Sequence, residues 1–444
     1  MDVLAQAAAM LQKYPLCDHC LGRQFALLGY NLENNRRGEA LKLGLTLQAS
    51  AEASNKKLEG TKCLKVLAAN GFSQIAQATL KHLKKRLPRV EAQHCFLCDD
   101  RFQQVDKLVS LILEATQHYE YATFLIGIEI PVSVEEREDE FKSAFSVGYS
   151  ENIKHEFGRV LGKRVEAQTG KPPDYRKPDL MIIINPFTSK IKLQVNPLFI
   201  AGRYKKLVRT IPQSKWFCST CRGRGCDKCN GTGLMYPDSV EALISKPVLE
   251  VSNGEDSAFH ASGREDIDAR MLGTGRPFVV EISKPKKRFL DLKKLEDAIN
   301  TGAKDKVVIS RFRFTSREVV RKLKKAENAQ KEYRALVNFE KEVSDTDMHL
   351  LEQKLNGVMI HQQTPLRVVH RRADLVRERY IYRLKVKRLS PKEALMEIRT
   401  QGGLYVKELV SGDEGRTVPS VTELLSNPAK IIKLDVLKVI MEDQ

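Results

Sequence analysis

The sequence predicts an α+β protein with more than one domain. Its 444 residues are enough for two or three domains with substantial cores, and a hydrophobic content of 42% is that of a globular chain. Strand-sized apolar runs alternate with segments of helical periodicity along much of the chain. The formal net charge of +18 indicates a polyanionic partner, because lysine and arginine displace counterions from phosphates.

The apolar runs are too short for a membrane protein. No stretch approaches the roughly 20 residues that span a bilayer, and runs such as Phe124 to Ile130 have strand length. The chain begins Met1-Asp2 with no basic region before its alanines and leucines, which is not typical of a signal peptide. We therefore expect a soluble, cytoplasmic protein that is a monomer and has no membrane partner.

Eight of the nine cysteines form Cys-x-x-Cys pairs, which favour zinc over disulfides in an intracellular protein. The predicted ligands of a first zinc are Cys17, Cys20, Cys95 and Cys98, and those of a possible second zinc are Cys218, Cys221, Cys226 and Cys229. Free or redox-active thiols are the alternative. His19 and His94 lie beside the first set and could replace a ligand, whereas Cys63 is left over as a small buried hydrophobe.

The second cysteine set has glycines between and after its pairs. Its local form Cys-x-x-Cys-x-Gly-x-Gly resembles the zinc knuckles of DnaJ-type chaperones, in which glycines let the backbone turn its amides toward the thiolates. Four thiolates leave no open metal position for catalysis. We expect this knuckle, residues 218–233, to make a basic loop rigid.

The first half of the chain reads as helices followed by alternating strands and helices. The predicted elements are a helix and cysteine knuckle over residues 1–30, a basic helix over 80–87, a strand over 121–132, a helix over 135–155 and a buried strand over 177–185. Lys177-Pro-Asp179 followed by an apolar strand resembles the THUMP domain, an RNA-binding module of tRNA-modifying enzymes. Basic residues between Lys154 and Arg164 either meet a phosphate backbone or form a solvated helix face.

The second half begins with a basic segment and continues as strands and helices. Tyr204, Lys205 and Lys206 lie in a run that interleaves an aromatic with basic residues, which suits contact with RNA. The predicted elements are a helix over 239–245, strands over 248–251, 277–282 and 307–314, a helix from the capping box at 315–318 to about 330, strands over 331–339 and 394–400, and a helix from 404.

Residues 262–278 combine three acids, three arginines and three glycines. Such a run can hold an acidic side chain among cations in a tight turn. Within it Gly263-Arg264-Glu265-Asp266 resembles the segment that carries the nucleophilic aspartate of TruA-type pseudouridine synthases, and the longer run resembles the Pus-ten family. The resemblance implies that Asp266 is catalytic, with Asp268 as the fallback, and that Arg264 and Arg270 contact RNA. Solvated turn acids paired with arginines are the alternative.

Three later motifs resemble the same enzymes. Lys331-x-Tyr333-x-Ala335 is similar to a motif whose aromatic packs against the target base, although Tyr333 could be a core tyrosine. Lys407 matches the basic residue that pairs with the catalytic aspartate in a TruB-type element, and Leu404 departs from that element's threonine. The segment 364–373 resembles one of Pus-ten proteins and offers Arg367, His370, Arg371 and Arg372. These residues bind RNA, support the site or belong to a solvated basic strand.

The ordered motifs identify the chain as a member of the archaeal-type Pus-ten tRNA pseudouridine synthases. The family implies isomerisation of uridines 54 and 55 in the tRNA T loop, without a catalytic or nucleotide cofactor. It implies a catalytic domain over 198–444, with a mixed, mainly antiparallel sheet flanked by helices, and an RNA-binding accessory domain over 1–197 with THUMP from about 75. A non-catalytic zinc-containing tRNA-binding protein, a THUMP-bearing methyltransferase and a DNA-binding zinc-finger protein are the rivals. The methyltransferase would need a glycine-rich cofactor loop that the sequence lacks, and the knuckles lack the repeated finger spacing.

Overall fold

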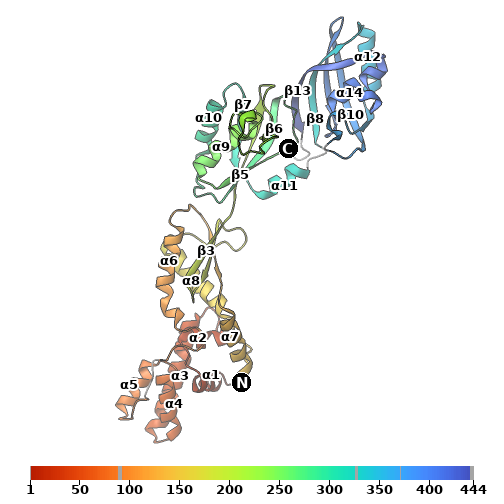
Figure 1. The fold of residues 1–444 in the computed structure, drawn as a ribbon. Coiled ribbons are helices and arrows are strands. Elements are labelled where there is room, and N and C mark those ends of the chain that lie inside the picture. The colour runs from red at the N-terminus through yellow and green to blue at the C-terminus, as the bar shows by residue number, and fades with distance from the viewer. Residues whose placement is uncertain (1, 89–92, 326–328, 371, 441–444) are drawn as a thin grey trace. The chain divides into compact units, whose positions relative to one another are not determined.

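The chain folds into two compact units, residues 1–196 and 197–444. The computed structural model describes residues 2–88, 93–325, 329–370 and 372–440 (Figure 1). No helix within these ranges combines the length and the apolar content needed to cross a membrane.

The first unit joins a group of helices to a small sheet. Its helices are α1 (Val3–Lys13), α2 (Asp18–Gly22), α3 (Asn34–Ser54), α4 (Leu58–Ala69), α5 (Gln74–His82), α6 (Val105–Thr116), α7 (Val132–Ala144) and α8 (Ile153–Thr169). Its strands are β1 (Phe124–Ile128), β2 (Leu180–Asn185) and β3 (Lys190–Val195), in the order β1-β2-β3. Strand β1 runs parallel to β2, and β3 runs antiparallel to β2. Alternate residues of β2 are buried, as a strand with one core-facing side requires.

Two predicted boundaries in this unit are wrong. The helix expected over 135–155 is two helices, because Asn152 starts α8 by accepting a hydrogen bond from the amide of His155 at 2.8 Å. The basic helix expected over 80–87 is the end of α5, whose last residue is His82.

The second unit is built on one large mixed sheet. Its strands are β4 (Leu198–Lys206), β5 (Asp256–Ala261), β6 (Ala269–Ser283), β7 (Val307–Phe314), β8 (Gln330–Phe339), β9 (Val358–Gln363), β10 (Val376–Ser390), β11 (Glu393–Thr400), β12 (Thr417–Val418) and β13 (Ala429–Ile440). The strand order is β12-β9-β10-β11-β8-β13-β6-β4-β7, with β5 added on β6. All of these pairings are antiparallel except that between β13 and β6. The predicted fold class, a mainly antiparallel mixed sheet flanked by helices, is confirmed.

The helices of this unit pack along the sheet (Figure 1). They are α9 (Val240–Ser252), α10 (Leu292–Gly302), α11 (Arg317–Lys325), α12 (Asp345–Leu355), α13 (Leu366–Val369), α14 (Val406–Ser411) and α15 (Val421–Leu425). The strand expected over 248–251 is wrong, because these residues continue α9. Val240, Ile244 and Val248 recur at helical spacing and are all buried, so one face of a single helix covers the core. Helix α11 is described as far as Lys325, and residues 326–328, just before the end expected near 330, lie outside the described residues.

A short parallel pairing between β6 and β13 joins the two halves of the large sheet. Its register sets Ala269, Arg270 and Met271 opposite Leu434, Asp435 and Val436. Arg270 Nε and Nη2 donate to Asp435 Oδ1 and Oδ2, both at 2.9 Å. Arg209 Nη2 donates to the same carboxylate at 2.5 Å. Arg270 was predicted to contact RNA, but in the structure its guanidinium forms an ion pair with Asp435 on the neighbouring strand.

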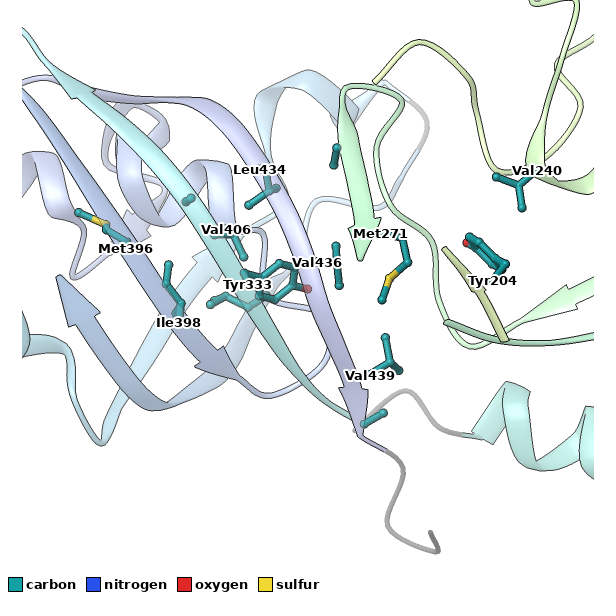
Figure 2. Close-up of a cluster of buried hydrophobic side chains, with 14 of the residues drawn as sticks. Tyr204, Val240, Met271, Tyr333, Met396, Ile398, Val406, Leu434, Val436 and Val439 are labelled. Atoms are coloured by element: carbon teal, nitrogen blue, oxygen red, sulfur yellow. The ribbon is translucent and has the colours of Figure 1, made fainter. Parts of the chain in front are cut away.

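The apolar core runs continuously across this pairing. Figure 2 shows Val436 and Met271 between Tyr333 and Tyr204, and all four side chains belong to one buried cluster. One buried cluster therefore includes residues from both halves of the sheet.

We expect Asp435→Asn to destabilise the protein by about 1–3 kcal/mol, because the change leaves two arginines beside a mostly buried position without their counter-charge. Urea unfolding followed by circular dichroism measures the difference.

The matched control is Glu397→Gln. Glu397 pairs with Arg334 across β11 and β8, but both side chains are 48% exposed, so the loss should be at most about 1 kcal/mol. Equal unfolding midpoints for the two variants would contradict the importance of Asp435.

Candidate active site

A pocket of about 810 Å³ opens in the second unit beside the β6–β13 pairing. The loop before β6 forms part of its wall. Further lining residues come from β5, β6, β8, β10, β13, α11, the segment after β9 and the start of α14. Its cationic lining residues are Arg264, Arg276, Lys324, Lys331, Arg367, Arg372, Arg377, Arg379 and Lys407. The acids that line it are Glu265 and Asp266. Such an excess of positive charge suits a polyanionic ligand.

Asp266 lies in the loop between β5 and β6, within reach of two cations. Lys407 Nζ and Arg367 Nη1 each lie 3.2 Å from Asp266 Oδ2. The aspartate side chain is 40% exposed, so its carboxylate remains open to the pocket. Residues separated by more than 100 positions in sequence therefore meet at one carboxylate.

The two cations keep Asp266 ionised. Burial alone would raise the pKa of this carboxyl, but the charges of Arg367 and Lys407 and their hydrogen bonds outweigh burial, so its pKa lies below the ordinary value. A carboxylate that stays charged and open to a pocket can act as a nucleophile or a base.

Lys407 also holds the fallback residue Asp268. Its Nζ donates to both carboxylate oxygens of Asp268 at 2.8 Å, closer than its contact with Asp266. Asp268 is 66% exposed and is not part of the pocket lining. Of the two aspartates, Asp266 is therefore the one that faces the pocket.

A buried polar network supports the loop, and two of its members, Glu265 and Arg276, also line the pocket. Tyr204 donates its hydroxyl hydrogen to Glu265 at 2.9–3.0 Å, and Arg276 Nε donates to Glu265 Oε2 at 2.9 Å. Gln213 Nε2 donates to the Tyr204 hydroxyl at 2.7 Å and to the carbonyl of Gly263 at 3.0 Å. These contacts hold Gly263 and Glu265, which precede Asp266 in the loop.

Tyr204 and Lys206 were predicted to contact RNA, but both are buried. Both residues have 0% exposure. Lys206 Nζ donates to the carbonyls of Ile211, Asp266 and Ile267, each at 3.0 Å. On strand β4 these two side chains point into the core and support the loop, which the interleaving of basic and aromatic residues cannot reveal.

Tyr333 lines the pocket from strand β8 and is 9% exposed. Burial raises the pKa of its phenol to about 12, against the opposing effect of Arg276. The hydroxyl therefore stays protonated at neutral pH, and the ring provides an apolar wall near Asp266.

The remaining predicted residues lie in different surroundings. Arg367 also donates to Glu408 at 2.6 Å, and Arg372 donates to the hydroxyl of Tyr405 at 2.7 Å. His370 is exposed and Lys205 is half-buried, and neither lines the pocket. Arg371 lies outside the described residues. Arg264 is exposed and places its guanidinium 5.3 Å from the ring centroid of Trp216.

Lys331 was named in the Lys-x-Tyr-x-Ala motif without a role of its own, yet it lines the pocket. Burial and the neighbouring charge of Arg276 lower the pKa of Lys331 to about 8. The alternation of β8 could have revealed it, because residues two apart on a strand share a face and Tyr333 is on the same side. Glu265 and Arg276 belong to the run over residues 262–278, but no role of their own was predicted for them.

The eight paired cysteines form two groups in which the four sulfurs lie within 4.8 Å of one another. The Sγ to Sγ distances are 3.6 Å for Cys17 and Cys98, 3.7 Å for Cys226 and Cys229, and 3.8 Å for Cys221 and Cys229. A tetrahedral zinc with bonds of about 2.3 Å needs edges of about 3.8 Å, whereas a disulfide needs about 2.05 Å. Both groups could therefore hold a metal ion.

Backbone amides point at the sulfurs of the second group. Gly225 and Gly233 donate to the sulfurs of Cys221 and Cys229 at 3.2 Å. Amides of Cys221 and Thr220 lower the pKa of the Cys218 thiol to about 6. Such thiolate stabilisation suits metal ligation. In the first group the neighbouring histidines have other partners: His19 contacts Glu156 at 2.6 Å and His94 contacts Asp100 at 2.7 Å.

Two family models match the chain. The model described as "Pus10, C-terminal" matches residues 199–440, and the model described as "Pus10 THUMP domain, archaeal" matches residues 108–185, a narrower range than the one expected from about 75. Together they match nearly all of the second unit and part of the first, in which residues before 108 are not matched by either model.

Similar proteins of the same description occur in several archaea. The "tRNA pseudouridine synthase Pus10" of Methanocaldococcus jannaschii is 43% identical over 97% of this chain and 93% of its own length. That of Methanothermobacter marburgensis is 42% identical over 99% of each chain. A chain of a solved Cbf5-Nop10-Gar1 complex is 16% identical over 45% of this chain and 46% of its own, with a TM-score of 0.28, which is too low to support an argument.

We expect Lys407→Met to raise the pKa of Asp266, because one of the two nearby cations is lost while burial of the carboxyl remains. At a mildly acidic pH a smaller fraction of Asp266 would then be ionised. A ¹³C NMR titration of aspartate carboxyl carbons, with the Asp266 resonance assigned through Asp266→Asn, measures the change.

Lys438→Met is the control for this titration. Lys438 pairs with Glu332 at 3.0 Å and does not line the pocket, so the Asp266 resonance should titrate as in the parent. An unchanged titration in Lys407→Met would show that Lys407 does not control the charge of Asp266.

Proposed function

The chain belongs to the Pus10 family of tRNA pseudouridine synthases, and on this premise we propose that it isomerises uridines 54 and 55 of the tRNA T loop with Asp266 as nucleophile. The observation that carries the assignment of Asp266 is its contact with Lys407 and Arg367 at 3.2 Å in a pocket rich in cations.

The reaction is an internal rearrangement. The bond from ribose C1′ to uracil N1 breaks, the base turns, and C5 takes the place of N1 on C1′. The proton on C5 is lost and N1 gains one, so the product is an isomer and no electrons are exchanged with another molecule. In the proposed mechanism the carboxylate of Asp266 attacks C1′ and is later displaced by C5. The chemistry therefore needs no catalytic or nucleotide cofactor.

Each side chain near Asp266 has a proposed role that follows from its position. Lys407 and Arg367 keep the carboxylate charged and oriented, and they stabilise the negative charge that develops on the departing base. The ring of Tyr333 stacks against the uracil from β8. Arg264, exposed at the rim of the pocket, helps hold the nucleotide out of its stack.

The phosphate backbone of the tRNA would meet the remaining basic side chains. Arg372, Arg377 and Arg379 line the pocket, and Lys205 and His370 offer further contacts outside it. We propose that the accessory unit, whose residues 108–185 match the THUMP model, binds the acceptor stem. We further propose that the protein acts as a monomer in the cytoplasm.

We propose that the metal in both cysteine groups is structural zinc. The sulfur spacing fits a tetrahedral ion, and four thiolates complete its coordination. In the first unit such an ion would tie residues 17–20 to residues 95–98, and in the second it would close the knuckle.

Asp266→Ala should abolish pseudouridine formation, a loss on the order of 10⁴-fold or more, as is typical when a nucleophile is removed. Tritium release from a tRNA transcript labelled at C5 of uridine measures turnover, and transcripts that keep a single uridine at 54 or 55 locate it.

The controls for this experiment are RNA binding and Asp268→Ala. Both variants should bind tRNA with near-parent affinity, and Asp268→Ala should keep most of the activity because Asp268 does not line the pocket. Activity that survives in Asp266→Ala but not in Asp268→Ala would move the nucleophile to Asp268. A parent that binds tRNA without releasing tritium would favour a binding protein.

The purified protein should contain two zinc ions per chain. Cys20→Ser and Cys221→Ser should each retain one, because each removes a ligand from a different group. Mass spectrometry of the metal content after dialysis measures the stoichiometry. Loss of both ions in either single variant, or none bound in the parent, would contradict two independent zinc sites.

A further inference from the structure

Residues 209–216, which we call the supporting segment, lie against the loop that carries Asp266. Arg209 Nη1 donates to the carbonyl of Asp268 at 3.1 Å, and Gln213 Nε2 donates to that of Gly263 at 3.0 Å. The third contact is between Trp216 and Arg264, with 5.3 Å from the guanidinium carbon to the ring centroid. The first and last residues of the supporting segment, Arg209 and Trp216, thus both contact the loop.

The C-terminal end of the supporting segment is held by the knuckle of the second cysteine group. Trp216 is two residues before Cys218, and its carbonyl accepts a hydrogen bond from the amide of Met235 at 2.8 Å. Phe217 pairs with Leu234, and the amide of Cys218 donates to Gly233 at 2.8 Å. The chain before the knuckle is therefore paired with the chain after it, and the four sulfurs close the loop between them.

Arg264 depends on this arrangement for its position. Within the described part of the chain no acid forms an ion pair with Arg264, although its side chain lines the pocket. The ring of Trp216 is itself packed edge-on against Tyr236, 5.7 Å between centroids, across the base of the knuckle. An exposed arginine has many rotamers, and a fixed aromatic face selects those that point into the pocket.

We propose that metal in the second cysteine group positions Arg264 in the pocket through Trp216, which makes Trp216 a positioning residue for the reaction. The role assigned to Arg264 rests on the proposed function, whereas the coupling from metal to Trp216 does not. The metal takes no part in the chemistry, because its four thiolate ligands leave no position for substrate.

Trp216 is the only tryptophan of the chain, so its fluorescence reports on the coupling without any assay of turnover. Zinc added to full-length protein stripped by a chelator should change Trp216 emission in the parent and in Cys20→Ser, whose second group is intact, and not in Cys221→Ser. An unchanged emission in the parent, or a response lost in Cys20→Ser, would overturn the coupling.

Kinetics test whether Trp216 acts through Arg264. Trp216→Leu should lower kcat about two- to tenfold, the range expected for loss of a partly exposed cation–π contact, with a smaller effect on KM for tRNA. Trp216→Phe, which keeps an aromatic face, should recover most of the loss. The double variant Trp216→Leu/Arg264→Gln should be no slower than Arg264→Gln alone.

Phe217→Leu is the matched control for these variants. Phe217 is adjacent to Trp216 in sequence but is 62% exposed, and parent-like kinetics are expected. Additive losses in the double variant, or a Trp216→Phe variant as slow as Trp216→Leu, would overturn the positioning role. A zinc-dependent change in emission from a parent that makes no pseudouridine would support the coupling and overturn the proposed function.

Discussion

The pairing of β6 with β13 is the constraint on which the rest of the site depends. Three residues on each strand form it, and the carboxylate of Asp435 binds Arg270 across the strands and Arg209 from the supporting segment. On one side of this pairing lies the loop with Asp266, and on the other lie the elements that carry Tyr333, Lys407 and Arg367. A small shift in register would separate the carboxylate from both of its cations.

Charge is arranged in two layers around Asp266. At the inner wall of the pocket, buried Glu265 neutralises Arg276 and accepts a hydrogen bond from Tyr204, so that these buried polar groups have partners. In front of it, cations exceed acids, and the pocket keeps a positive potential toward its opening. The inner layer holds the backbone in one conformation, and the outer layer supplies the electrostatic environment for an ionised carboxylate and a polyanionic substrate.

The sequence allowed the fold class and the pairing of Asp266 with Lys407 to be predicted, because ordered motifs carried both through a family resemblance. Cysteine spacing likewise predicted the two sulfur groups. The sequence did not reveal which cations are held by other protein groups, and Lys206 and Arg270 were both predicted to contact RNA. In the structure Lys206 donates to backbone carbonyls in the core, and Arg270 donates to a carboxylate on the neighbouring strand. The meeting of Trp216 with Arg264 is a tertiary contact that no local pattern encodes.

The position of β13 in the sheet has a consequence for synthesis of the protein. This strand, residues 429–440, lies between β8 and β6, although both of these are made earlier. While the ribosome is translating residues 340–428, the two halves of the sheet have no strand to join them. Because Leu434 and Val436 of β13 line the pocket, the complete pocket can form only after this last strand has left the ribosomal tunnel.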